Sequence, residues 1–484
     1  MRTSLTHPLM IAEVQAKLGH GLIGLTFCPG KHQPDAMTGG WRRNLGIDLD
    51  AIRDWGAVTV VTLVEEHELR ALKVPDLGKK VRDRHMAWYH LPIKDVAIPS
   101  PQFEADWAEV GKGLRARLRD GFNVLVHCKG GLGRTGTIAA RLLIELGMAP
   151  QMAIGVVRQA RPGAIETAEQ ETHVLALSEA PEGAPDTSPA ATMDRAIGAL
   201  LGLAAGDAVG TSLEFKTRDS YPPLTDMVGG GPFGLKAGQW TDDTAMALAL
   251  ADSLTANDGL DEDDLMARFV RWHEQGEYSC TGSCFDIGIT TRQALSRWKR
   301  TGNPTAGSTD PQTAGNGSLM RLAPVAIRFW RDRPTMRDVA ARQSAMTHAA
   351  PEAIDACVAF AEVLADAIQG RPRSQVLRDR VGPYAGAIQP IMAGSWRGEG
   401  RNHVRATGYV AHSLEASLWS VGRTGSFEEA VLLAANLGED ADTTAAITGQ
   451  LAGALYGANG IPQRWRDLLA WEPRIRAMAE GIFQ

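Results

Sequence analysis

The sequence lacks any long, uninterrupted run of apolar side chains. Its longest apolar or glycine stretch, Ala196–Gly206, is well below the ~20 residues that a helix needs to span a bilayer. The apolar run near the start, Leu9–Ala12, stops at Glu13 and is too short for a signal-peptide core of about 7–15 residues. We therefore expect a cytoplasmic protein with no membrane partner.

Cysteines and an excess of one charge are also scarce. Five cysteines in 484 residues form an odd, sparse set, which favours free thiols in a reducing compartment and excludes a disulfide scaffold. The 50 Lys and Arg residues against 56 Asp and Glu residues give a net charge of −6, which does not suggest a general nucleic-acid binder. The hydrophobic content of 44% excludes global disorder.

The chain divides near its first third. Residues 179–191 hold prolines and small residues without one large apolar side chain, which is typical of a linker. The length suits two or three domains of roughly 100–200 residues each. The sequence thus predicts a first domain over residues 1–178 and a second over residues 192–484.

The two parts differ in their patterns. The first alternates strand signals (Ala57–Val64, Phe122–Val126) with helix signals (Phe103–Leu118, Thr137–Leu146), which predicts an α/β fold with a central sheet flanked by helices. The second is rich in Ala, Leu and Gly and has few β-branched runs. We expect it to be all-α, with helices over Met193–Ala205, Thr244–Leu254, Pro351–Ile368, His412–Val421, Phe427–Asn436 and Thr443–Leu455 and a long loop over Asp219–Gln239.

A cysteine stands in a glycine-rich loop between a predicted strand and a predicted helix. Cys128 is followed by five residues and then Arg134. Backbone N–H groups of such a loop, together with the helix N-terminus, bind an oxyanion and favour a thiolate nucleophile. Arg134 can grip two phosphate oxygens through its planar fork. The predicted phosphate-binding residues between and after these two are Lys129, Gly130, Gly131, Leu132, Gly133 and Thr135.

Cysteine attack on phosphorus also needs a proton for the leaving oxygen. Asp95 lies on a proline-flanked loop, and we expect it to act first as general acid and then as the base that activates water. The alternative is structural: a buried cysteine can be inert packing, a glycine-rich turn before a helix is common in α/β folds, and exposed aspartates are commonplace.

The segment HCKGGLGRTGT, which begins at His127, resembles the signature of dual-specificity protein phosphatases, the cyclin-dependent-kinase-associated type in particular. Three further segments also resemble this phosphatase family: Gly24–Gly30, Leu91–Pro99 and Arg161–Gln170. The resemblance covers about residues 20–178. It implies a phosphocysteine intermediate at Cys128, a phosphorylated substrate and no metal in this domain.

Two acidic motifs stand before predicted helices of the second part. One contains Thr241, Asp242 and Asp243, and the other contains Asp440, Asp442 and Thr443. Either motif alone is explained by helix N-capping. Together they offer hard oxygen ligands whose mutual repulsion requires cations, and Mg²⁺ or Mn²⁺ prefers such sites. A pair of these ions could clamp substrate hydroxyls and activate water.

These motifs form an ordered series with other polar segments of the second part. The others are Gly206–Phe215, Thr281–Gly288, Gly315–Arg321, Thr347–His348 and Gly408–Tyr409. Over about residues 192–484 the series resembles the ADP-ribosylglycohydrolase family, most of all its dinitrogenase-reductase-activating type. The resemblance implies an all-α fold and a centre of two Mg²⁺ or Mn²⁺ ions held by the six residues of the acidic motifs.

The same resemblance implies further roles. Glu214 matches a mobile acidic residue near the metals, and the positions that match the ADP-ribose pocket are Asp286, Asn316, Gly317, Ser318, His348 and Tyr409. The implied reaction is hydrolysis at the anomeric carbon of ADP-ribose, on an ADP-ribosylated protein or an ADP-ribose derivative.

The sequence therefore predicts a bifunctional hydrolase, a cysteine phosphatase fused to an ADP-ribosyl hydrolase. Two alternatives remain open. The first part could be a binding module that recognises phosphate without turnover. The second could be an ADP-ribose reader, although a reader has no need for metal ions that activate water.

Overall fold

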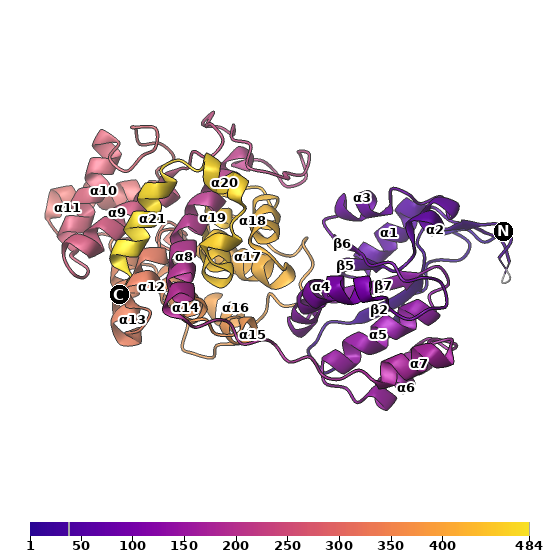
Figure 1. Ribbon diagram of the computed structural model, residues 1–484. Coiled ribbons are helices and arrows are strands. Elements are labelled where there is room, and N and C mark those ends of the chain that lie inside the picture. Colours follow the sequence, from indigo (N-terminus) through magenta and orange to yellow (C-terminus); the bar gives the residue numbers. More distant parts are fainter. Residues whose placement is uncertain (37–38, 484) are drawn as a thin grey trace. The chain divides into compact units, whose positions relative to one another are not determined.

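The computed structural model describes residues 1–36 and 39–483 (Figure 1). The chain forms two compact units, Met1–Gly183 and Ala184–Gln484. Each unit has its own secondary-structure class, as the patterns of the sequence indicate.

The first unit alternates strands and helices. Its elements are β1 (Ala12–Val14), β2 (Ile23–Phe27), β3 (His32–Gln33), β4 (Trp41–Arg42), α1 (Leu45–Asp54), β5 (Ala57–Thr62), α2 (Glu66–Ala71), α3 (Leu77–Arg82), β6 (Ala87–His90), α4 (Pro101–Arg119), β7 (Asn123–Cys128), α5 (Gly133–Glu145), α6 (Pro150–Ala160) and α7 (Ala168–Leu175).

The central sheet has the order β1-β2-β7-β5-β6. Strands β2, β7, β5 and β6 are parallel, and β1 is an antiparallel edge. Every residue of β2 and β5 is buried, because helices pack against the sheet and the strands are almost entirely apolar or β-branched. Phe27 is paired with Cys128 and Thr62 with His127, so the carboxyl ends of three strands meet at the cysteine loop. The predicted α/β fold is confirmed.

Two helices of this unit begin earlier than the sequence pattern predicts. Helix α4 starts at Pro101, two residues before the expected start, because Ser100 caps it and proline suits the first turn. Helix α5 starts at Gly133 rather than at Thr137. The cysteine loop is therefore followed directly by a helix N-terminus.

The second unit is helical, and its described part contains no β-strand. Its elements are α8 (Pro189–Gly210), η1 (Thr211–Leu213), α9 (Asp242–Ala256), α10 (Glu262–Gln275), α11 (Ile289–Thr301), η2 (Pro311–Thr313), α12 (Ala323–Phe329), α13 (Arg333–Ala345), α14 (Pro351–Gln369), α15 (Arg373–Val376), α16 (Ile388–Met392), α17 (Val410–Arg423), α18 (Phe427–Ala435), α19 (Ala441–Tyr456), η3 (Ala458–Gly460), α20 (Gln463–Leu468) and α21 (Glu472–Ile482).

Helix α8 lies at the centre of this unit. By length and composition the segment Pro189–Leu213 could cross a membrane, but its apolar window is fully buried in the protein. The helix begins at Pro189, inside the segment that reads as a linker, because Ser188 caps it and Pro189 occupies its first turn. An apolar helix of this kind is a core helix that other helices surround.

Helices α8 and α19 touch through glycines. Four glycines of α8 recur every fourth residue: Gly198, Gly202, Gly206 and Gly210. A Cβ atom at Gly202 would lie 2.2 Å from the carbonyl oxygen of Gly449, and one at Gly206 would lie 2.1 Å from that of Ala445. Only a hydrogen atom fits at these positions. The contact holds the N-terminus of α19 beside the C-terminal turns of α8.

We expect the substitution Gly202→Ala to destabilise the helical unit by about 1–3 kcal/mol, because the added methyl group overpacks a backbone contact. The urea midpoint of that unit's unfolding transition measures the effect. The matched control is Gly481→Ala in α21, where a Cβ atom would meet nothing within 4 Å. That change should be neutral or stabilising by up to ~1 kcal/mol. Equal midpoints for the two variants would contradict the packing argument.

Candidate active sites

The cysteine loop follows the last residue of β7. Cys128 is buried, and the N–H group of Gly131 donates to its Sγ atom at 3.2 Å. Gly131 has φ of +74°, and a Cβ atom there would lie 2.5 Å from the backbone of Thr26. The tight turn that aims this amide at the sulfur therefore requires glycine.

Two basic side chains hold the loop from its outer side. Lys31 donates to the carbonyl oxygen of Lys129 at 3.4 Å. Arg161 donates to the carbonyl oxygens of Gly130 and Gly131 at 3.4 and 3.2 Å. The amide of Gly131 points at the sulfur of Cys128, whereas the amide of Gly133 donates to Glu166 Oε2 at 2.7 Å. These bonds fix the backbone of the loop around Cys128.

Arg134 is buried beside this loop, and its guanidinium group binds two acids. It donates to both carboxylate oxygens of Glu68, at 2.6 and 3.0 Å, and lies 2.9 Å from Asp95 Oδ1. Burial acts to raise the pKa of Glu68, but hydrogen bonds from Arg134 hold it below its ordinary value. Glu68 fixes the guanidinium plane before any substrate arrives.

Sequence reasoning missed Glu68. Its only sequence signal is the pair Glu65 and Glu68, which forms a capping box at the start of α2. The same side chain both caps α2 and binds Arg134. A capping pattern does not reveal a partner 66 residues away.

Three other residues near the loop differ in exposure: Asp95 is exposed, whereas Thr135 and His127 are buried. The Asp95 side chain is 58% exposed beside Arg134, at the open side of the loop, where we placed a general acid. Thr135 Oγ1 is buried and has no hydrogen-bond partner among the described residues. His127 binds Thr62 through its ring, and burial lowers its pKa to about 3, so the imidazole is neutral.

The second site is a set of carboxylates at the starts of α9 and α19. Asp207, Asp243 and Asp442 bring oxygens within 4.8 Å of one another, and so do Glu214, Asp440 and Asp442. Asp442 belongs to both clusters. The two motifs that lie far apart in the sequence therefore meet.

Asp207 is the member that sequence reasoning missed. This fully buried carboxylate accepts hydrogen bonds from the backbone N–H and the hydroxyl of Thr241, both at 2.9 Å. It also accepts from the N–H and the hydroxyl of Thr244, at 3.1 and 2.6 Å. It thus ties α8 to the first turn of α9. The sequence feature that could have revealed Asp207 is its position in the polar segment Gly206–Phe215, which also contains Glu214.

Burial and mutual repulsion disfavour the charged forms of these acids. They raise the pKa values of Asp207, Asp440 and Asp442 to about 7, and burial, with the neighbouring carboxylates, raises that of Glu214 well above its ordinary value. Asp243 Oδ1 is buried without a hydrogen-bond partner among the described residues. A cluster of hard oxygen donors with an unsatisfied carboxylate oxygen fits a divalent cation such as Mg²⁺ or Mn²⁺.

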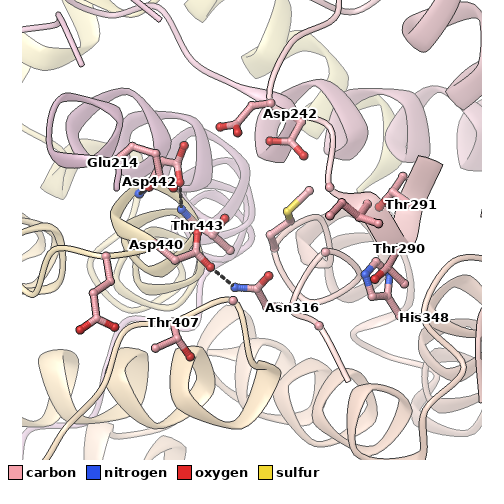
Figure 2. A pocket seen from close by; sticks show the side chains of 18 of the residues that line it. Glu214, Asp242, Thr290, Thr291, Asn316, His348, Thr407, Asp440, Asp442 and Thr443 are labelled. Atoms are coloured by element: carbon pink, nitrogen blue, oxygen red, sulfur yellow. Dashed lines mark hydrogen bonds between the residues drawn. The ribbon is translucent and has the colours of Figure 1, made fainter. Parts of the chain in front are cut away.

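A cavity of about 560 Å³ opens beside the acidic cluster. Figure 2 shows Glu214, Asp440 and Asp442 on one side of it and Thr290, Thr291 and His348 on the other. The predicted residues that line it are Glu214, Asp242, Asp286, Asn316, Gly317, His348, Asp440, Asp442 and Thr443. Thr241 and Asp243 lie beneath these, in the buried hydrogen-bond network.

Contacts within the wall fix several of these side chains. Asn316 donates to Asp440 Oδ2 at 2.7 Å and to Ser413 Oγ at 2.8 Å. His348 is bonded to Thr347 through Nδ1, and burial lowers its pKa to about 3, so it presents a neutral ring. Sequence reasoning did not single out Phe215, Thr290 or Glu439, which also line the cavity.

Two predicted pocket residues do not line this cavity. Ser318 is fully buried, and its hydroxyl is bonded to Ser344 in the core, because its side chain points away on the other side of the turn. The Tyr409 hydroxyl donates to Glu352 at 2.7 Å, and the residue lines an adjoining cavity that shares Thr290 with the first. Neither residue lines the main cavity, and Tyr409 reaches only the adjoining one.

Comparison with known proteins now identifies the second unit. The sequence profile described as ADP-ribosylglycohydrolase matches residues 188–484. The chain belongs to this family. The ADP-ribosylarginine hydrolase Tri1 of Pseudomonas putida (strain GB-1) is 46% identical over 296 residues, which cover 61% of this chain and 80% of that protein. The ADP-ribosyl-[dinitrogen reductase] glycohydrolase of Rhodospirillum rubrum is 33% identical over 295 residues, covering 60% and 95%.

The first unit has relatives of its own. The profile described as Swiss Army Knife protein, DSP-PTPase phosphatase domain, matches residues 33–174. Cyclin-dependent kinase inhibitor 3 of Rattus norvegicus is 32% identical over 155 residues, which cover 31% of this chain and 69% of that protein. This ADP-ribosylglycohydrolase is therefore fused to a phosphatase domain. Its enzyme class is that of a hydrolase, and its family is metal-dependent.

We expect divalent ions to stabilise the helical unit more at about pH 8 than at about pH 5. The pKa values of Asp207, Asp440 and Asp442 are raised in the fold, from 3.8 to about 7. The folded state therefore binds more protons than the unfolded chain between these values, and the metal-free protein loses stability as pH rises through this window. Bound cations remove this loss.

Thermal unfolding with chelator, Mg²⁺ or Mn²⁺ at the two pH values measures the difference. In the variant Asp442→Asn both the pH dependence without metal and the gain with metal should shrink. A metal-induced rise in Tm that is the same at both pH values would refute the link to these carboxylates.

Proposed function

We propose that the helical unit removes ADP-ribose from arginine side chains of modified proteins in the cytoplasm, in a metal-dependent reaction. The observation that carries this proposal is a cavity of about 560 Å³ whose wall includes the acidic cluster. Relatives named as ADP-ribosylarginine hydrolases support the arginine linkage. The cluster favours a hydrolase over a reader, because recognition of ADP-ribose alone does not require buried carboxylates that repel one another.

The acidic motifs supply the ligand set for two Mg²⁺ or Mn²⁺ ions: Thr241, Asp242, Asp243, Asp440, Asp442 and Thr443. Such ions, when bound, orient ribose hydroxyls and lower the pKa of a water molecule. The chain's own residues keep this set in place. Asn316 orients Asp440, and Asp207 holds Thr241 at the start of α9.

Glu214 is the residue that we propose moves the proton. Its carboxylate accepts from the N–H groups of Ala441 and Asp442, at 2.7 and 3.3 Å, and it also lines the cavity. A carboxyl group at this point can take a proton from the attacking water or give one to the leaving guanidine. Asp286, Asn316, Gly317 and His348 would contact ADP-ribose, with Ser318 and Tyr409 supporting the wall from behind.

We propose a second activity, phosphomonoester hydrolysis, for the first unit. The observation in its favour is the convergence of the Cys128 thiol, a loop whose carbonyls accept hydrogen bonds from Lys31 and Arg161, and Arg134 bound by two acids. Cys128 would attack phosphorus, Arg134 would grip the phosphate oxygens, and Asp95 would protonate the leaving oxygen. The competing function is a module that recognises phosphate without turnover.

The first prediction from these proposals concerns ADP-ribose release. Protein with ADP-ribosylated arginine should release ADP-ribose in the presence of Mg²⁺ or Mn²⁺ but not with chelator. The substitution Asp242→Ala should slow release at least ~100-fold, because it removes an oxygen ligand. The variant Cys128→Ser is the matched control and should keep the full rate. Binding of ADP-ribose without release would instead favour the reader.

The second prediction concerns the phosphatase. Hydrolysis of an aryl phosphate should vanish in Cys128→Ser, which removes the nucleophile. The change Glu68→Gln should lower kcat/KM by ~10–100-fold, because Arg134 loses a charge-assisted bidentate partner. The control Glu66→Gln changes an exposed acid on the same helix and should have no effect. Phosphate binding without any turnover in the unaltered protein would establish the recognition module.

A further inference from the structure

Three residues of the main cavity have a left-handed backbone that side chains disfavour. Phe215, Asp286 and Glu439 have φ of 61°, 62° and 61°, and none of them is glycine. Residues keep such a conformation only where the surrounding structure imposes it, and they concentrate at functional sites. Asp286 has a place in the proposed pocket, whereas Phe215 and Glu439 have no assigned role.

Backbone hydrogen bonds tie Phe215 and Glu439 together. The N–H of Phe215 donates to the carbonyl oxygen of Glu439 at 2.7 Å, and the N–H of Glu439 donates to that of Lys216 at 2.8 Å. Phe215 follows Glu214 in the chain, and Glu439 precedes Asp440. The two strained residues are therefore the direct neighbours of two acids in the cluster.

Phe215 places an aromatic ring at the opening of the cavity. Its side chain is among the exposed large apolar groups, at 68%, although it lines the cavity. Its ring meets that of Phe233 edge-on at 6.3 Å, and Phe233 contacts Phe285 at 5.2 Å. An exposed ring at a cavity mouth is available to whatever part of the substrate projects into solvent.

Glu439 is a partly exposed acid of the same cavity. It lines the cavity, but neither cluster of possible metal ligands includes it. Among the described residues its side chain makes no hydrogen bond or ion pair. Arg218 and His412 are near enough to interact with this negative charge, but neither is bonded to it. A carboxylate without a hydrogen bond can accept one from a cationic group of the substrate.

We infer that Phe215 and Glu439 form the subsite for the guanidinium group of the ADP-ribosylated arginine. This inference rests on the proposed function and adds the residues that select the acceptor. A guanidinium group offers a flat face to an aromatic ring and a fork of N–H donors to a carboxylate. It is also a cation that must approach bound metal cations, and the Glu439 carboxylate offsets that repulsion.

The test compares variants that separate the charge of Glu439 from its backbone strain. Glu439→Gln keeps the size and removes the charge, while Glu439→Gly removes the side chain and relieves the strain. We expect both to lower kcat/KM for an ADP-ribosyl-arginine peptide by roughly 10–100-fold, the effect of losing a charge-assisted hydrogen bond. Phe215→Leu should lower it a few-fold. Glu480→Gln is the control for net charge, because Glu480 is exposed on α21.

Calorimetry on the same proteins provides the second readout. The affinities for ADP-ribose and for Mg²⁺ should stay within about twofold of the unaltered protein, since neither ligand carries the guanidinium group. A kinetic loss without a loss of either affinity supports the subsite.

Three outcomes would overturn the inference. Full activity of both Glu439 variants would show that the carboxylate is not used, and full activity of Glu439→Gly alone would show a purely conformational role. Equal losses of activity and Mg²⁺ affinity would place Glu439 in the metal centre. If the unaltered protein releases no ADP-ribose from arginine, the proposed function itself fails, which is a distinct result.

Discussion

Helices α8 and α19 approach so closely that backbone carbonyls of one occupy the place of side chains on the other. The glycine row of α8 makes this possible, and the rest of the helical unit depends on it. Asp207 on α8 and Asp442 on α19 can share a cluster only because no Cβ atom separates the two helices at Gly206 and Gly210. Larger residues there would separate the carboxylates of the cluster.

The close approach of α8 and α19 brings negative charges near one another, which disfavours the folded state. Several carboxylates lie together in the protein, where burial first and then their mutual repulsion raise their pKa values. Hydrogen bonds from Thr241 and Thr244 and the positive N-termini of α9 and α19 offset part of this repulsion. Backbone strain at Phe215 and Glu439 adds to the cost. The protein without ligands is thus destabilised at the acidic cluster and the cavity wall, where bound ions and substrate would stabilise it.

The sequence allowed the motifs to be predicted, and with them both fold classes. Cys128 and Arg134, like Asp242 and Asp243, lie within one loop or turn, so local spacing reveals their geometry. Glu68 was missed because the capping box at the start of α2 already accounts for a glutamate at this position, without any partner far away in the sequence. Asp207 was missed, and the place of Glu439 in the cavity wall was not foreseen, because both depend on which helices pack together. The burial of the Ser318 side chain could not be predicted, because spacing does not tell which side of a turn faces the cavity.

The two sites use helix N-termini for opposite purposes. In the first unit α5 points its positive end at Cys128, and Lys31 and Arg161 add cations around the loop, so the surroundings favour an anion. In the second unit α9 and α19 begin at carboxylates, which are suited to hold cations. In the functions proposed above, the same dipole would favour a phosphate in the first unit and would support metal-binding carboxylates in the second. The side chains at the start of each helix, Arg134 in α5 and the aspartates in α9 and α19, therefore distinguish the two sites.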